Sequence, residues 1–78
     1  MDNKTLVKHR LATINNLLGV NDADDKFLEM ESCYAGNRRH YQLTSHRGSR
    51  NVTELVLLPE LVNICGGILY GIQVAQGS

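Results

Sequence analysis

The chain has 78 residues and equal numbers of basic and acidic side chains, eight of each, so its formal net charge is zero. This length corresponds to one domain with a small hydrophobic core, and it excludes a multi-domain organisation. Neutrality argues against a binder of long duplex nucleic acid, because such domains usually carry net positive charge. Two cysteines are too few for a disulfide framework, so we expect Cys33 and Cys65 to be buried free thiols in a reducing compartment.

The first segment predicts an amphipathic helix from Lys4 to Leu18. Its apolar positions follow a four-three-four spacing, which places them on one side of a helix; they are Val7, Leu11, Ile14 and Leu18. Asp2 or Asn3 can accept hydrogen bonds from the free amides of the first turn, and Gly19 suits the left-handed residue that ends a helix. A polar, acidic loop over residues 21–25 should follow.

Alternating apolar and polar residues predict a strand from Lys26 to Tyr34. Its core face is expected to be the one that avoids the carboxylates, and consists of Leu28, Met30, Ser32 and Tyr34. A tight turn over residues 35–37 leads to a second strand, Arg39 to Ser45, with Tyr41 and Leu43 on one side. The two strands should form a hairpin in which Glu29 or Glu31 pairs with Arg39 or His40.

After a loop over residues 46–51, the apolar run Val52 to Leu57 predicts a third strand that pairs with the second. Pro59 then suits the first turn of a helix that should run to Ala75. Its three-four spacing is the strongest periodic signal in the chain, and we expect Ile64, Ile68 and Leu69 to be buried. The apolar stretch from residue 55 to 74 approaches membrane-spanning length, but polar residues interrupt it, so a buried strand and helix are favoured.

Glycines inside this last helix are unusual, because each costs up to about 1 kcal/mol relative to alanine. Gly67 and Gly71 are four residues apart and share one side, which allows another backbone to approach closely. The helix could pack tightly in this way within its own chain, the interpretation we favour slightly, or it could cross a second copy in a homodimer. Tyr70 beside the apolar stripe indicates an interface, since its hydroxyl needs a partner.

These elements predict an α+β fold in the order α-β-β-β-α, with residues 1–78 as a single small domain. A three-stranded antiparallel meander should have both helices on one face. The other face would be open and carry polar side chains, namely Glu29, Glu31, Gln42, Thr44 and the ring of His40.

Four of the five arginines lie between Tyr34 and Thr53, and no Asp or Glu occurs from Ser32 to Thr53. Planar guanidinium groups suit phosphate and carboxylate, and glycine permits close backbone approach. The candidate anion-binding residues are Arg38, Arg39, His40, Arg47, Gly48, Ser49 and Arg50. Because the two ends of the second strand separate them, convergence would require oligomer contacts; ordinary surface arginines are an equally good interpretation.

Catalysis and metal binding have little support in the sequence. The cysteines and histidines match no zinc-ligand spacing, and a Cys–His nucleophile pair would lack a third, orienting group. We therefore predict no enzyme, no metal and no cofactor.

Several short runs resemble those of small uncharacterised proteins of bacteriophages and other mobile elements. They are Tyr34-Ala35-Gly36-Asn37, Tyr41-Gln42-Leu43, Gly48-Ser49-Arg50, Pro59-Glu60-Leu61 and Gly67-Ile68-Leu69-Tyr70-Gly71. The resemblance spans residues 27 to 73, although the turn here is longer and richer in arginine. It implies an accessory protein that occupies a host protein or sequesters a small signal, and it transfers no site residues.

Two functions from different classes follow. The first is a non-enzymatic, homo-oligomeric interaction protein, most simply a dimer with Gly67, Tyr70 and Gly71 at its interface, that binds a host macromolecule. The second is an oligomer that sequesters a small phosphorylated ligand, a nucleotide or cyclic nucleotide, through its arginine-rich loops. With no signal peptide apparent after Met1-Asp2-Asn3-Lys4, we expect a cytoplasmic protein that contacts no membrane.

Overall fold

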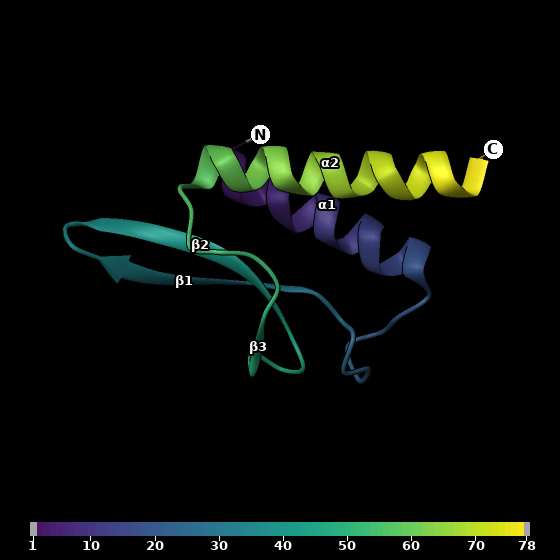
Figure 1. The fold of residues 1–78 in the computed structure, drawn as a ribbon, viewed down its shortest axis with the longest axis horizontal. Coiled ribbons are helices and arrows are strands. Elements are labelled where there is room, and N and C mark those ends of the chain that lie inside the picture. Colours follow the sequence, from purple (N-terminus) through teal and green to yellow (C-terminus); the bar gives the residue numbers. More distant parts are fainter. Residues whose placement is uncertain (1, 78) are drawn as a thin grey trace.

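Two helices and three strands occur in the predicted order, and both helices cover one face of the sheet (Figure 1). The computed structural model describes residues 2–77. The elements are α1 (Asn3–Leu18), β1 (Glu29–Ala35), β2 (Arg38–Ser45), β3 (Arg50–Asn51) and α2 (Leu58–Gly77). The sheet is antiparallel with the order β1-β2-β3. The α+β prediction is confirmed.

Both ends of α1 follow from local chemistry. The side chain of Asp2 accepts a hydrogen bond of 2.8 Å from the amide of Thr5, and this bond lowers the pKa of Asp2. Gly19 has a φ of 71°, and the amide of Val20 donates to the carbonyl of Asn15 at 3.0 Å. Such a left-handed cap is open mainly to glycine.

The two helices lie side by side and run in the same direction (Figure 1). Nη1 of Arg10, midway along α1, donates to the carbonyl of Val62 near the start of α2 at 2.8 Å. Near their ends, Nε2 of Gln76 donates to the carbonyl of Leu17 at 3.1 Å. These two bonds tie α2 to α1 along the length of the helix pair.

The core lies where the helices meet the inner end of β2. Its buried side chains are Val7, Leu11, Ile14, Leu43, Leu61 and Cys65. The predicted burial of Ile64, Ile68 and Leu69 is wrong in degree, since all three are partly buried and pack against this cluster. Among residues 2–77 the sheet contributes only Leu43 to this apolar cluster, so the helix can bury only a narrow strip of its apolar side.

Asn15 joins α1 to the segment that enters the sheet. It is buried, with Nδ2 donating to the carbonyl of Leu28 at 3.0 Å and Oδ1 accepting from the amide of Leu28 at 2.9 Å. The side-chain amide thus pairs with Leu28 as a neighbouring strand would. This pairing holds the chain in place just before β1.

The β1–β2 hairpin turns through two residues, Gly36 and Asn37, and Gly36 has a φ of 67°. Glycine at the first central position is typical of a type II′ turn. The turn sets the register, which places Glu31 opposite Gln42 and Arg39 opposite Tyr34. The predicted cross-strand pairing of a glutamate with Arg39 or His40 is therefore wrong.

The expected core face of β1 is also only partly correct. Leu28 and Met30 pack against the core, but Ser32 and Tyr34 are exposed. The hairpin extends beyond the helices, so neither helix covers its outer half (Figure 1). Cys33 lies in this outer half and is exposed, contrary to prediction; both cysteines are free, as expected.

The third strand pairs with β2 as predicted but does not extend over residues 52–57. Regular pairing stops after Asn51 and resumes at a single bridge between Tyr41 and Val56. Between these points, the amides of Val52 and Thr53 both donate to the carbonyl of Leu43. Two residues opposite one acceptor form a bulge, which bends the segment away from the regular pairing.

The turn over residues 46–49 covers part of the face expected to be open. His46, Arg47 and Gly48 have φ values of 55°, 58° and 88°, and a Cβ on Gly48 would lie 2.6 Å from Oε1 of Glu31. The turn therefore lies against the side chain of Glu31 in β1. Thr44, placed on the same face, is fully buried, so the prediction that it is open is wrong.

Candidate functional site

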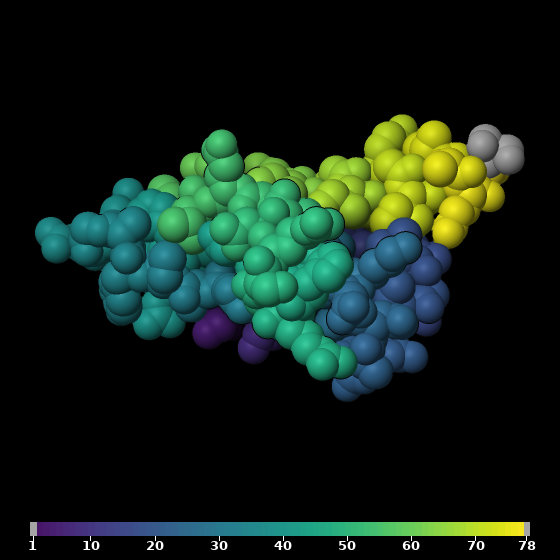
Figure 2. All heavy atoms as spheres, turned by 60° about the horizontal axis from the view of Figure 1, so that its bottom comes forward, coloured from purple at the N-terminus to yellow at the C-terminus, as the bar shows by residue number. Residues whose placement is uncertain are grey.

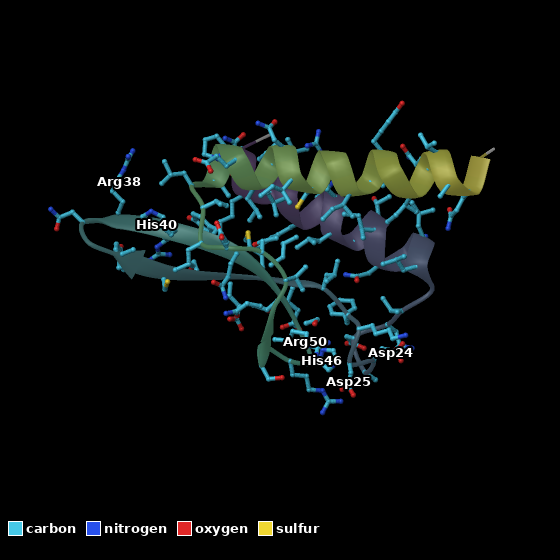
Figure 3. All side chains as sticks on the ribbon, viewed as in Figure 1. Asp24, Asp25, Arg38, His40, His46 and Arg50 are labelled. Atoms are coloured by element: carbon cyan, nitrogen blue, oxygen red, sulfur yellow. The ribbon has the colours of Figure 1, made fainter. Side chains whose placement is uncertain are left out.

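The candidate anion-binding residues form two groups at opposite ends of β2. Figure 3 shows Arg38 and His40 at one end of the sheet, and Arg50 and His46 beside Asp24 and Asp25 at the other. β2 runs from Arg38 to Ser45 and rises about 3.3 Å per residue, so roughly 23 Å separates the groups. One chain therefore does not bring the arginines to one ligand, as the sequence already indicated.

Arg38 and Arg39 of the first group belong to the outer part of the hairpin, residues 31–39, which we call the hairpin arm; His40 follows it and is partly buried. Every residue of the arm is exposed. Within it, Cζ of Arg39 lies 4.9 Å from the centroid of the Tyr34 ring, and Nη2 donates to the Tyr34 hydroxyl at 3.3 Å. The hydrogen bond to Tyr34 raises the pKa of Arg39, so the guanidinium remains charged while it stacks on the ring.

The second group is held by hydrogen bonds to its own chain. Nη2 of Arg47 donates to the carbonyl of Ala23 at 3.3 Å, and the amide of His46 donates to the carbonyl of Asp25 at 2.6 Å. Oγ of Ser49 donates to the carbonyl of His46 at 2.7 Å. The Glu31 carboxylate lies against Gly48, which places negative charge where the loop backbone was expected to receive an anion.

A different surface lies on α2, on the side opposite its buried residues Leu61 and Cys65. We define the outward face of α2 by Gly67, Tyr70, Gly71 and Val74, which recur at three- and four-residue spacing. Tyr70 is 69% exposed and Val74 is 50% exposed. A Cβ at either glycine would meet nothing within 4 Å in residues 2–77, so the interpretation of tight packing within the chain is wrong.

The last turns of α2 project from the body of the molecule (Figure 2). A shallow, open pocket lies there, lined by Tyr70, Gln73, Val74 and Gly77. By length and composition alone α2 could also cross a membrane. Core helices of soluble proteins meet the same criterion but are mostly buried, whereas 11% of this apolar stretch is buried. The outward face is uncharged, since Glu60 is the one charged residue of α2 and is not part of this face.

The other candidate chemistry is not assembled in the part of the chain that the structure describes. Residues 2–77 contain no group of three or more His, Cys, Asp or Glu side chains that could hold a metal ion. The register places Cys33 opposite His40, but Nδ1 of His40 lies 3.1 Å from the carbonyl of Arg38. Burial raises the pKa of the Cys65 thiol, which suits a core residue rather than a nucleophile.

Two features were missed in the sequence. The stacking of Tyr34 and Arg39 follows from the two-residue turn, because a turn of that length fixes which residues face each other. Val74 follows from its seven-residue separation from Gly67, which places both on the same side of a helix. In contrast, no local pattern indicates that Asn15 pairs with Leu28.

No protein-family model, curated protein or solved structure matches this chain. Its function is therefore inferred from its own residues and surfaces.

Proposed function

We propose that this chain is a non-enzymatic interaction protein that self-associates through the outward face of α2, most simply as a two-fold dimer. One observation carries the proposal: a helix of 20 residues exposes Tyr70 and Val74 around two glycines and has a single charged side chain. Such a face is costly to leave in water and suits a second helix at close approach.

A second copy fits this face for two reasons. The pair of glycines lies at the middle of the face and is open to solvent, so two such helices can cross there without side-chain obstruction. The flanking Asn63 and Gln73 are exposed and polar, which suits the wet rim of a protein interface. A symmetric contact would also cover the ring of Tyr70 and add apolar area to a chain whose own core is small.

In this role the protein would act by occupying a macromolecule of a host, as expected from its resemblance to accessory proteins of bacteriophages and mobile elements. The two free thiols suit a reducing compartment, so we infer a cytoplasmic location. The small phosphorylated ligand is the weaker alternative, because its arginines would have to come from two chains.

Sedimentation equilibrium at micromolar concentration tests the proposal, and we expect at least twice the chain mass of 8.7 kDa. Gly67→Leu and Gly71→Leu should weaken association without unfolding the chain, since leucine favours helix and no described atom lies in the way. Ala12→Leu is the matched control, because residue 12 is exposed on α1 and lies outside the outward face of α2. A natural chain that sediments as a monomer would contradict the proposal.

A further inference from the structure

The hairpin arm carries a second surface that self-association through α2 does not use. The arm comprises the exposed residues 31–39 and extends beyond the helices at the end of a two-stranded ribbon (Figure 1). Backbone bonds hold its strands over seven consecutive pairs, from Glu29–Thr44 to Ala35–Arg38. The arm therefore presents its side chains on a defined framework.

One side of the arm combines an aromatic ring with a cation. The guanidinium of Arg39 covers one face of the Tyr34 ring at 4.9 Å, while Tyr34 as a whole remains 68% exposed. A planar group, such as a base, can therefore stack on the other face of the ring. The phosphate about one nucleotide from that base would then lie near the charge of Arg39. Tyr41 lies on the same side of the sheet, two residues from Arg39.

Charge on this side of the arm favours an anionic partner. Arg39 is exposed here, and no acidic residue occurs from Ser32 to Thr53. Arg38 precedes Arg39 in β2 and pairs with Ala35, so it lies on the opposite side. The two glutamates of β1, Glu29 and Glu31, alternate with Met30 and Ser32 and so lie on the opposite side of the sheet from Tyr34. Repulsion by these carboxylates is therefore directed away from the Tyr34–Arg39 pair.

We propose that the hairpin arm binds single-stranded nucleic acid, with a base stacked on the free face of Tyr34 and a phosphate contacted by Arg39. An acidic peptide would use this arginine but leave the ring unused. A duplex keeps its bases stacked on each other, and the chain has neither net positive charge nor a basic helix for a groove. The partner that uses both the ring and the cation of Arg39 is an unpaired strand.

Fluorescence anisotropy with labelled oligo(dT) of about 12 nucleotides tests this proposal, since that length falls within the usual range of a single-strand site. We expect the logarithm of the affinity to fall with the logarithm of salt concentration with a slope of about −0.7, for one contacted phosphate. Arg39→Ala should remove this slope. Arg38→Ala, on the opposite side of the arm, is the matched arginine control and should leave the slope unchanged.

The ring is tested separately. Tyr34→Ala should weaken binding by about tenfold or more, whereas Tyr34→Phe should retain it because the stacking face is preserved. The chain has three tyrosines and no tryptophan, so oligo(dT) should quench tyrosine emission in the natural chain and quench it less in Tyr34→Phe. This second measurement decides the matter even if Tyr34→Ala disturbs the hairpin.

The proposal is independent of self-association, so the Gly67→Leu variant should bind oligo(dT) with the same affinity per chain. It is overturned if the natural chain does not bind oligo(dT) at low salt, or if Tyr34→Ala binds as the natural chain does. Binding of a polyglutamate peptide or of duplex DNA as tightly as oligo(dT) would overturn it as well.

Discussion

Individual residues hold the unusual backbone of the turn between β2 and β3. His46 and Arg47 adopt positive φ although neither is glycine. Such residues cost of order 1–3 kcal/mol each unless the surrounding structure compensates. Here the amide of His46 donates a hydrogen bond to the carbonyl of Asp25, and the guanidinium of Arg47 donates one to the carbonyl of Ala23. These two bonds attach the turn to the acidic loop.

Gly48 should be the position of this turn that is most sensitive to substitution. Its φ is 88°, so Gly48→Ala should lower the free energy of unfolding by about 1–2 kcal/mol through backbone strain. The added Cβ would also displace Oε1 of Glu31, but that atom is the end of a flexible side chain and can move. Urea denaturation measures the effect.

Gly36→Ala is the matched control for this substitution, because Gly36 has a φ of 67° and a Cβ there would meet no described atom within 4 Å. We expect the two variants to lose similar stability. If Gly48→Ala costs much more, and Glu31→Ala removes the excess, contact with the carboxylate rather than backbone strain dominates.

At the scale of elements, α2 has two different sides. Leu61 and Cys65 are fully buried against α1 and β2, whereas Ile68 is only partly buried. Leu61→Ala should therefore lower the free energy of unfolding by about 2–5 kcal/mol. Ile68→Ala should cost clearly less, because part of its side chain already contacts water. Chemical denaturation of both variants at one protein concentration checks this order, which equal losses would contradict.

How far these elements could be predicted depends on the range of the interactions that define them. The caps of α1 at Asp2 and Gly19 and the turn at Gly36 rest on contacts within a few residues, so composition indicates them. Burial along α2 depends on where the helices cross the sheet, which periodicity does not show. The expected strand over residues 52–57 failed for a similar reason, since a bulge opposite Leu43 interrupts it.

The candidate site shows the same difference between features set by neighbouring residues and features set by contacts between distant segments. Sequence spacing placed Gly67 and Gly71 on one side of α2 and Tyr70 beside its apolar stripe, but it did not tell whether the glycines face the chain itself or solvent. The separation of the arginines into two groups could be inferred from strand length alone. The stacking of Arg39 on Tyr34 required the register, and the placement of Glu31 against Gly48 required the tertiary structure.

At the scale of the whole molecule, the two cysteines report on different parts of the fold. Cys33 is exposed on the arm, while Cys65 is buried and has a pKa raised by that burial. A disulfide-exchange reagent should therefore modify one thiol per native chain rapidly and the second only as fast as the core opens. Cys33→Ser should remove the fast phase, so that only the slow modification of Cys65 remains. Rapid modification of both thiols in the natural chain would show that the core is not closed.

The parallel direction of the helices has an electrical consequence. Each helix carries partial positive charge at its start and partial negative charge at its end, and parallel helices add these dipoles instead of cancelling them. The helix starts lie toward the end that carries Arg38, while Asp24 and Asp25 follow the end of α1 (Figures 1 and 3). A chain without net charge thus has a permanent dipole along its length, and near a polyanion it would turn so that the arginines of the arm approach first.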